Sequence, residues 1–307
     1  MQRTPTERAG PDHSSLLDDR RVRLAWLAVA VVGTAAGIST LWLHLTTDPF
    51  ADVHAYYDAG SRLNAGLPLY PIGADPDAAD FYRYPPLLAM LFRPLAMLPF
   101  AAAATVWELI LVAAFLAVVW ALGVRRRETW LAVGVLGSPI AWTLSIGQAQ
   151  GLVTLLTTLA APWSIALAAQ FKLFPALVVL WWVGSRQWRK VVAFSAWTVG
   201  LVLIQLVFEP ANTAAFAAQT NLAQVGDVIN VSPYRISPTL WAVLVAMGVV
   251  VTLRLSRTRW GWIAAVALSV LATPRLLTYM FSTLLAAIAR RSAVEASTIA
   301  SDSEKSG

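Results

Sequence analysis

The chain of 307 residues has little charge and no cysteine. Only 13% of its residues are charged and 58% are hydrophobic, whereas a soluble domain carries about 25% charged and about 45–50% apolar residues. This shortage of charge excludes a soluble enzyme, a nucleic-acid-binding module and a disordered protein. Without cysteine the chain has no disulfide framework, thiolate nucleophile or cysteine metal ligand. With only three histidines, we also expect no histidine metal cluster.

Long hydrophobic runs are what the chain has instead. The first, residues 24–45, is long enough to cross a bilayer as a helix. It is longer than the apolar core of a signal peptide and no cleavage site follows it, so we expect a retained span. Nine further runs follow, at 100–123, 129–146, 150–162, 163–172, 174–184, 191–208, 237–253, 260–273 and 276–289. The sequence therefore predicts an all-α polytopic membrane protein with about ten transmembrane helices. The runs between 150 and 184 fit either two full spans or one span with a re-entrant hairpin.

Arginine and lysine gather in the short connections between these runs. The clusters lie at residues 20–23, 125–127, 186–190, 254–259 and 290–291. Lysine and arginine in short loops stay on the cytoplasmic side, and ten spans place every cluster there. We therefore expect both termini in the cytoplasm. The high content of Ala, Val, Arg and Trp suits a GC-rich genome and favours a bacterial plasma membrane.

The same pattern divides the chain into segments. Residues 24–289 form the predicted integral membrane domain. The polar tails, 1–23 and 290–307, are expected to be cytoplasmic and disordered. Two outer loops are expected, at 46–99 and 209–236.

The first outer loop, 46–99, carries most of the chemical information. Its tyrosines and phenylalanines alternate with carboxylates, which argues against disorder. The pattern predicts a helix over about 52–63, which Asn64-Ala65-Gly66 ends. An apolar piece at 87–98 follows, too short to span the membrane and broken at Arg93-Pro94, so we expect it along the interface. An aromatic-lined vestibule above the bilayer is the expected result.

Asp52 stands just beyond the first span and a turn or two before the tyrosines. A carboxylate at the membrane boundary among apolar residues can serve as a general base. The alternative is a solvated loop acid or an N-cap of the 52–63 helix. Asp48 and Asp58 are weaker candidates for the base, because the same general argument applies to them and no further feature favours either.

Amides and isolated cations mark five other positions. Gln148 and Gln150 could bind a sugar hydroxyl, or they could cap a helix turn. Lys172 lies between two apolar runs, where charge is costly and indicates function, although snorkelling to the headgroups also explains it. Arg275 has the same ambiguity. Together with Arg235, these cations suit an anionic lipid headgroup such as a phosphate.

Several of these pieces resemble one known family. The segments are DVHAYYDAG at 52–60, LNAGLPLY at 63–70, YPP at 84–86, PLAMLP at 94–99, GQ at 147–148, FKLFP at 171–175 and the cluster at 186–190. In this order and spacing they resemble glycosyltransferase family 87, over about residues 40–290. The resemblance implies the GT-C membrane fold and a polyprenyl-phosphate sugar as donor, as in actinobacterial mannosyltransferases.

By this resemblance Asp52 is the catalytic base. Family members often carry a Ser-Pro pair followed by His near the last span, where this chain has Thr273-Pro274-Arg275, so headgroup recognition there would use Arg275 and Tyr279. The chain is also short for the family. The expected substrate-binding residues are His54, Tyr57, Arg62, Tyr70, Tyr84, Gln148, Lys172, Arg235, Arg275 and Tyr279.

The expected function is an integral membrane glycosyltransferase. It would move a hexose, mannose by the resemblance, from a polyprenyl-phosphate donor to a lipid or glycan acceptor on the outer face, with inversion. The donor is a substrate, and neither a metal nor another cofactor is expected. The expected partners are membrane lipids, the lipid-linked sugar and the acceptor, and not nucleic acid. A lipid-linked sugar transporter or flippase, which needs no base, and a non-catalytic scaffold are the alternatives.

Overall fold

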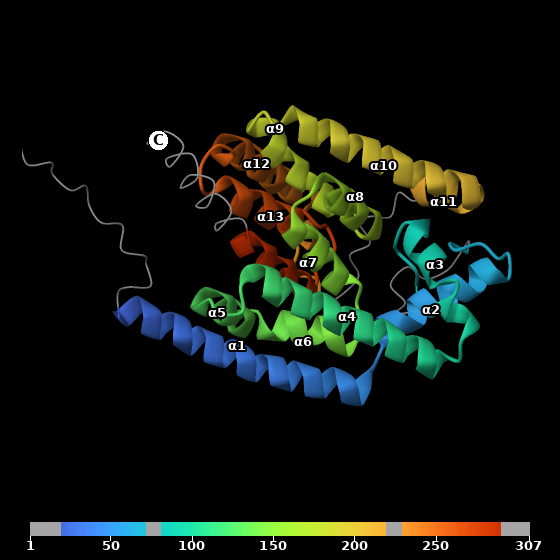
Figure 1. Ribbon diagram of the computed structural model, residues 1–307, viewed down its shortest axis with the longest axis horizontal. Helices are drawn as coiled ribbons and strands as arrows, with labels where there is room; N and C mark the ends of the chain where they lie inside the picture. Colours follow the sequence, from blue (N-terminus) through green and yellow to red (C-terminus); the bar gives the residue numbers. More distant parts are fainter. Residues whose placement is uncertain (1–19, 72–80, 219–228, 290–307) are drawn as a thin grey trace, which may run out of the picture.

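The computed structural model describes residues 20–71, 81–218 and 229–289, and these residues form helices without any β-strand (Figure 1). Four helices are long and apolar enough to cross a membrane: α1 (Arg20–Thr47), α4 (Phe100–Leu122), α10 (Trp188–Phe208) and α12 (Pro238–Leu255). The all-α prediction is confirmed over these residues. The count of about ten spans and the GT-C fold stay predictions.

Shorter helices occupy the other predicted runs. They are α5 (Arg127–Val135), α6 (Gly137–Ser145), α7 (Gln150–Leu159), α8 (Pro162–Phe171), η2 (Phe174–Val178), α9 (Val179–Gly184), α13 (Gly261–Leu271) and η4 (Thr278–Leu285). The run 129–146 is thus two helices and not one. Pro139 has no N–H to bond the carbonyl of Val135, and α5 ends at that residue.

Glycines bring α1 against α5 and α6 (Figure 1). Gly33 and Gly37 are four residues apart on one face of α1, the small-residue spacing that lets membrane helices approach closely. A Cβ atom at Gly33 would collide with the carbonyl oxygen of Gly134, and one at Gly37 would lie 2.7 Å from the carbonyl carbon of Gly137. This contact carries the end of α1 to the end of α6, where the candidate site begins.

The first outer loop folds much as its sequence predicts. It contains α2 (Ala51–Asn64), α3 (Pro86–Phe92) and η1 (Leu95–Met97), so the helix expected over 52–63 is confirmed to within one residue at each end. Arg93-Pro94 separates α3 from η1, as expected. Tyr56 and Phe92 are fully buried where α2 and α3 pack on α4. This packing fixes α2 and α3 against the rest of the described molecule.

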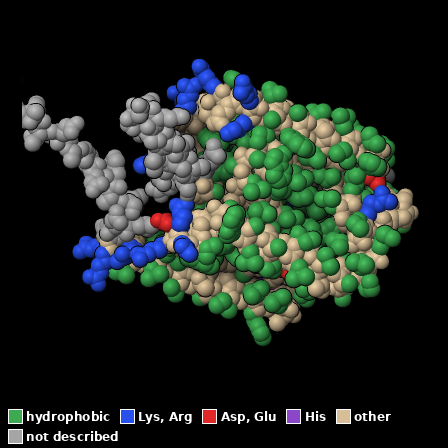
Figure 2. Space-filling view, in the orientation of Figure 1, with side chains coloured by type: hydrophobic (Ala, Val, Ile, Leu, Met, Phe, Trp, Pro, Cys, Tyr) green, Lys and Arg blue, Asp and Glu red, His purple; other side chains and the backbone are tan. Residues whose placement is uncertain are grey.

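Arginine clusters and the first outer loop lie at opposite ends of the molecule. The clusters at 20–23, 125–127, 186–190 and 254–259 adjoin helix ends on the left of Figure 1, whereas α2, α3 and α11 (Pro210–Ala218) lie on the right. Between them, hydrophobic side chains cover most of the visible face (Figure 2). The cluster at 290–291 and most of both predicted tails lie outside the described residues, as do 72–80 and 219–228 of the outer loops.

Candidate active site

A cavity of about 790 Å³ lies between the first outer loop and the later helices. Phe81, Trp142, Phe171 and Phe216 are among its apolar walls. Its polar and charged lining consists of Asp48, Asp52, Tyr70, Arg83, Tyr84, Gln150, Lys172, Ser269, Thr273, Arg275, Tyr279 and Thr283. A large apolar pocket with a few converging polar groups is the usual form of a small-molecule site.

Asp52 reaches this cavity from the first turn of α2. The backbone N–H of Phe50 donates to the carbonyl of Ser145 at 3.2 Å, and that of Asp52 donates to Ile146 at 3.1 Å. These bonds fix the start of α2 on the end of α6. Phe50, in the left-handed region with φ 59°, is the N-cap residue and makes no side-chain capping bond. The interpretation of Asp52 as an N-cap is therefore wrong.

The surroundings of Asp52 change its proton affinity. Burial raises the pKa of this carboxyl from 3.8 to about 6, against the opposing effects of Lys172, Arg83, Arg275 and the amide of Gln148. Asp52 lies outside the four candidate spans, and its side chain is half-buried in the wall of the cavity. The interpretation as a solvated loop acid does not fit this position, where burial raises the pKa of the carboxyl.

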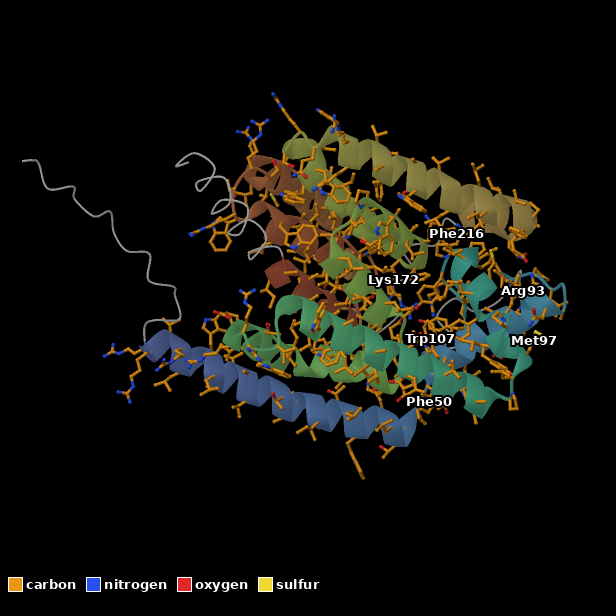
Figure 3. The ribbon with its side chains drawn as sticks, viewed as in Figure 1. Phe50, Arg93, Met97, Trp107, Lys172 and Phe216 are labelled. Atoms are coloured by element: carbon orange, nitrogen blue, oxygen red, sulfur yellow. The ribbon has the colours of Figure 1, made fainter. Side chains whose placement is uncertain are left out.

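Lys172 is held by two tyrosines of the cavity. Its Nζ donates to the hydroxyl of Tyr279 at 3.2 Å and lies 4.5 Å from the centre of that ring. It also lies 5.6 Å from the centre of the Tyr84 ring, a cation–π geometry. In Figure 3 Lys172 lies in the interior, away from Arg93 and Met97 at the end of the molecule. This placement fits a cavity residue better than a side chain that snorkels to the headgroups.

Arg83 is a site residue that was not among the predicted ones. It lines the cavity with Arg275, and its charge acts on Asp52. Its Nη1 donates to the carbonyl of Phe81 at 3.1 Å, and its guanidinium lies 5.4 Å from the centre of that ring. The signal was present in the sequence, since a single arginine among aromatics precedes the Pro-Pro pair at the start of α3.

Gln148 is fully buried and is not among the residues that line the cavity. Its Oε1 accepts hydrogen bonds from the hydroxyls of Tyr56, at 2.6 Å, and Tyr84, at 3.2 Å. The turn before it needs Gly147, whose φ is 69° and whose added Cβ would collide with Cγ2 of Val53. The side chain therefore joins the tyrosines behind Asp52, and neither predicted role, sugar binding or turn capping, describes its contacts.

In Gln150, among the residues that the structure describes, it is the amide nitrogen that is bonded and the oxygen that lacks a partner. This residue lines the cavity with Thr283, and its Nε2 donates to the hydroxyl oxygen of Thr283 at 2.6 Å. Thr154 lies 2.9 Å from the same oxygen and donates to the carbonyl of Gln150 at 2.9 Å. Within the described residues, the buried Oε1 of Gln150 has no hydrogen-bond partner. A buried acceptor of this kind calls for a donor.

Glycosyltransferase family 87 matches residues 81–300 of this chain. The chain belongs to that family. It is 29% identical over 195 residues to the polyprenol-phosphate-mannose-dependent alpha-(1-2)-phosphatidylinositol pentamannoside mannosyltransferase of Mycolicibacterium smegmatis, covering 57% of this chain and 48% of that protein. It is 28% identical over 211 residues to the protein of the same name from Mycobacterium tuberculosis, covering 58% and 47%.

The chain thus spans about half the length of these curated relatives. No solved structure matches it. The segment matched to glycosyltransferase family 87 contains Arg83, Lys172, Arg275 and the other lining residues after position 80. Asp52 precedes that segment, so its assignment depends on its place in the cavity and on the resemblance of the first outer loop.

Besides Gln148, four predicted substrate-binding residues do not line the cavity of this family 87 member. His54 stacks on a phenylalanine ring of α4 with 3.8 Å between ring centres. The hydroxyl of Tyr57 donates to a backbone carbonyl after η1, and Nε of Arg62 donates to one in the turn after α2. Arg235 is exposed in η3 (Pro233–Arg235). We therefore leave these four out of the proposed site.

Proposed function

We propose that this chain is an integral membrane glycosyltransferase that moves a hexose from a polyprenyl-phosphate donor to a lipid or glycan acceptor, with Asp52 as general base. One observation supports it most: a single cavity combines the Asp52 carboxylate with three cations, Lys172, Arg83 and Arg275. The relatives' names give mannose as the hexose and a phosphatidylinositol mannoside as the acceptor class. We extend both to this chain as part of the proposal.

The cations would hold the phosphate of the donor. A phosphate leaves the sugar as a stabilised anion, so its departure needs no protein acid. Arginine can bind it through two N–H groups and lysine as a point charge. One well-placed donor of this kind contributes about 3–4 kcal/mol to the transition state. Because a lipid monophosphate carries less charge than a nucleotide diphosphate, the proposed reaction needs neither a metal nor a further cofactor.

Asp52 would take the proton of the acceptor hydroxyl. As the hydroxyl oxygen bonds to the anomeric carbon, the bond from that carbon to the phosphate oxygen breaks, and the proton moves to the carboxylate. A single displacement of this kind inverts the anomeric centre. A pKa of about 6 suits this role, since a general base works best when its pKa lies near the operating pH.

The outer face of a bacterial plasma membrane is the proposed location. Asp52 and Arg83 belong to the loop that lies opposite the arginine clusters (Figures 1 and 2). Lysine and arginine in short loops stay in the cytoplasm, which supports an outer location for that loop. Surface labelling of a single cysteine introduced at exposed Leu67 tests this: reaction with an impermeant reagent in intact cells is expected, and protection until lysis contradicts it.

The test of function compares three proteins in lipid nanodiscs with radiolabelled polyprenyl-phosphate mannose and phosphatidylinositol mannosides. Wild type should form labelled glycolipid, and Asp52→Asn should lower the rate by about 10²–10⁴-fold. Asp58→Asn is the matched control. This exposed residue of the same helix is not among those that line the cavity, so its rate should stay near that of wild type.

The same proteins in sealed liposomes address the two alternatives. A transporter would move the labelled donor across the bilayer without forming product and would tolerate Asp52→Asn. A scaffold would do neither. Equal transfer by wild type and Asp52→Asn would show that Asp52 is not the base.

A further inference from the structure

A buried group of polar side chains stands directly behind Asp52. Gln148 and Tyr56 are both fully enclosed, and Tyr84 contacts them while also lining the cavity. They come from three separate parts of the chain, α2, the segment before α3 and the turn before α7. The hydrogen bonds among these buried groups hold them in one arrangement.

The hydrogen bonds of this group determine which way the amide of Gln148 faces. Each tyrosine hydroxyl has one hydrogen. That of Tyr56 points to Oε1 of Gln148 at 2.6 Å, while its oxygen accepts the backbone N–H of Ala149 at 3.2 Å. Tyr84 donates to the same Oε1 at 3.2 Å. With two donors on the oxygen, the amide nitrogen must face the other way.

On that other side the buried amide nitrogen has no hydrogen-bond partner among the described residues. Asp52 is the nearby acceptor: it precedes Tyr56 by one turn of α2, and its backbone N–H donates to the carbonyl of Ile146, two residues before Gln148. The effect of the Gln148 amide on the Asp52 carboxyl, which favours the charged form, agrees with this placement. Such bonds are often long before substrate binds and shorten in the reacting complex. A carboxylate has two oxygens, so a donor behind one of them leaves the other for the acceptor hydroxyl.

We propose that Gln148 is a positioning residue, which the hydroxyls of Tyr56 and Tyr84 orient so that its amide nitrogen holds one oxygen of Asp52 and turns the other toward the acceptor. This inference rests on the proposed function, because it gives Asp52 the role of base. It differs from the role predicted from the sequence, since Gln148 here contacts the base and not the sugar. Tyr56 is the second part of the device, because without its hydroxyl the amide is free to turn.

The test measures the protonation of Asp52 directly. Protein labelled with [4-¹³C]aspartate in nanodiscs is titrated by NMR, and the Asp52 signal is assigned by its loss in Asp52→Asn. Gln148→Leu removes a donor that stabilises the charged carboxylate, so the titration midpoint should rise by about one pH unit. Tyr56→Phe should raise it by less. Gln187→Leu, at the arginine end, is the matched control and should leave it unchanged.

Transfer kinetics give the second measurement. The acidic limb of the pH profile of kcat/KM should move upward by the same amount in Gln148→Leu, so activity lost at pH 6 returns at higher pH. A role in folding alone would lower the rate equally at every pH. An unchanged Asp52 midpoint in folded Gln148→Leu, or an equal loss at all pH values, overturns the inference.

Two further controls separate the possible failures. The NMR titration needs no turnover, so a wild type that transfers no sugar refutes the proposed function while the titration still decides the contact between Gln148 and Asp52. Thermal unfolding shows which variants fold. If Gln148→Leu does not fold, Tyr56→Phe, which keeps its ring, decides the question: a raised midpoint supports the inference and an unchanged one overturns it.

Discussion

Charged side chains are exposed at the arginine end of this molecule and half-buried in its cavity. At the arginine end, Arg20, Arg125, Arg189 and Arg254 are exposed. In the cavity, Arg83, Lys172 and Arg275 are half-buried, and their charges act on the Asp52 carboxylate of the same lining. An exposed charge is stabilised by water, whereas a charge removed from water needs a partner.

This difference separates two uses of the same residue types. Exposed arginines give the chain a direction in the membrane and need no defined geometry. The cavity cations lie at fixed positions among tyrosines, and their arrangement is costly unless it serves a ligand. Substitutions at the arginine end and in the cavity should therefore have very different effects on sugar transfer.

The largest difference is expected between Lys172→Met and Arg189→Met. Loss of the Lys172 charge removes a donor from the proposed phosphate site, and kcat/KM for transfer should fall by about 10²–10³-fold. Arg189→Met removes the same charge from an exposed position and should leave the rate near wild type. Steady-state transfer by protein in nanodiscs provides the measurement. Similar rates for the two variants would contradict a functional distinction between the cavity and the arginine end.

A smaller effect should appear when pH is lowered. Burial raises the pKa of Asp52 to about 6, and the base must be unprotonated to accept a proton. The value of kcat/KM should therefore be constant above that pH and fall about tenfold for each pH unit below it. Arg189→Met should show the same profile. A rate that persists down to pH 4 would mean that Asp52 titrates as an ordinary exposed acid.

Local sequence signals predicted much of the first outer loop. Three local features predicted these elements: the helical pattern over 52–63, the stop at Asn64-Ala65-Gly66 and the break at Arg93-Pro94. Helices α2, α3 and η1 follow them. The break of 129–146 was missed, although Pro139 signals it. A run that is apolar throughout predicts burial or membrane, but it does not by itself show where the helix stops.

The direction in which each side chain points was harder to predict, because it depends on contacts between segments that are distant in the sequence. His54 and Asp52 are two residues apart on α2, yet one stacks on α4 and the other lines the cavity. Packing of Tyr56 against Phe92 and Trp107 sets the rotation of this helix. The pairing of Gln148 with Tyr56, 92 residues earlier, likewise has no local signal.

The smallest effect concerns the hydrogen-bond acceptor that Gln150 presents. Its Nε2 is bonded to Thr283, and its Oε1 is buried with no partner among the described residues. We expect a small turn of the side chain to bring this oxygen to a sugar hydroxyl, which has a hydrogen to donate, whereas phosphate oxygens have none. Gln150→Met keeps the volume and removes the acceptor. A hydrogen bond between neutral groups contributes about 1 kcal/mol net, so kcat/KM should fall about fivefold.

Deoxy analogues of the donor sugar, each lacking one hydroxyl, locate the group that Gln150 contacts. Wild type should lose about the same fivefold with one of these analogues, and Gln150→Met should lose nothing further with it, because the two changes remove the same bond. Gln187→Met at the arginine end controls for the loss of an amide. If every deoxy donor and every deoxy acceptor lowers the rate of Gln150→Met as much as that of wild type, Gln150 does not contact a substrate hydroxyl. The contrast between the cavity and the arginine end would then rest on the charged residues of the cavity alone.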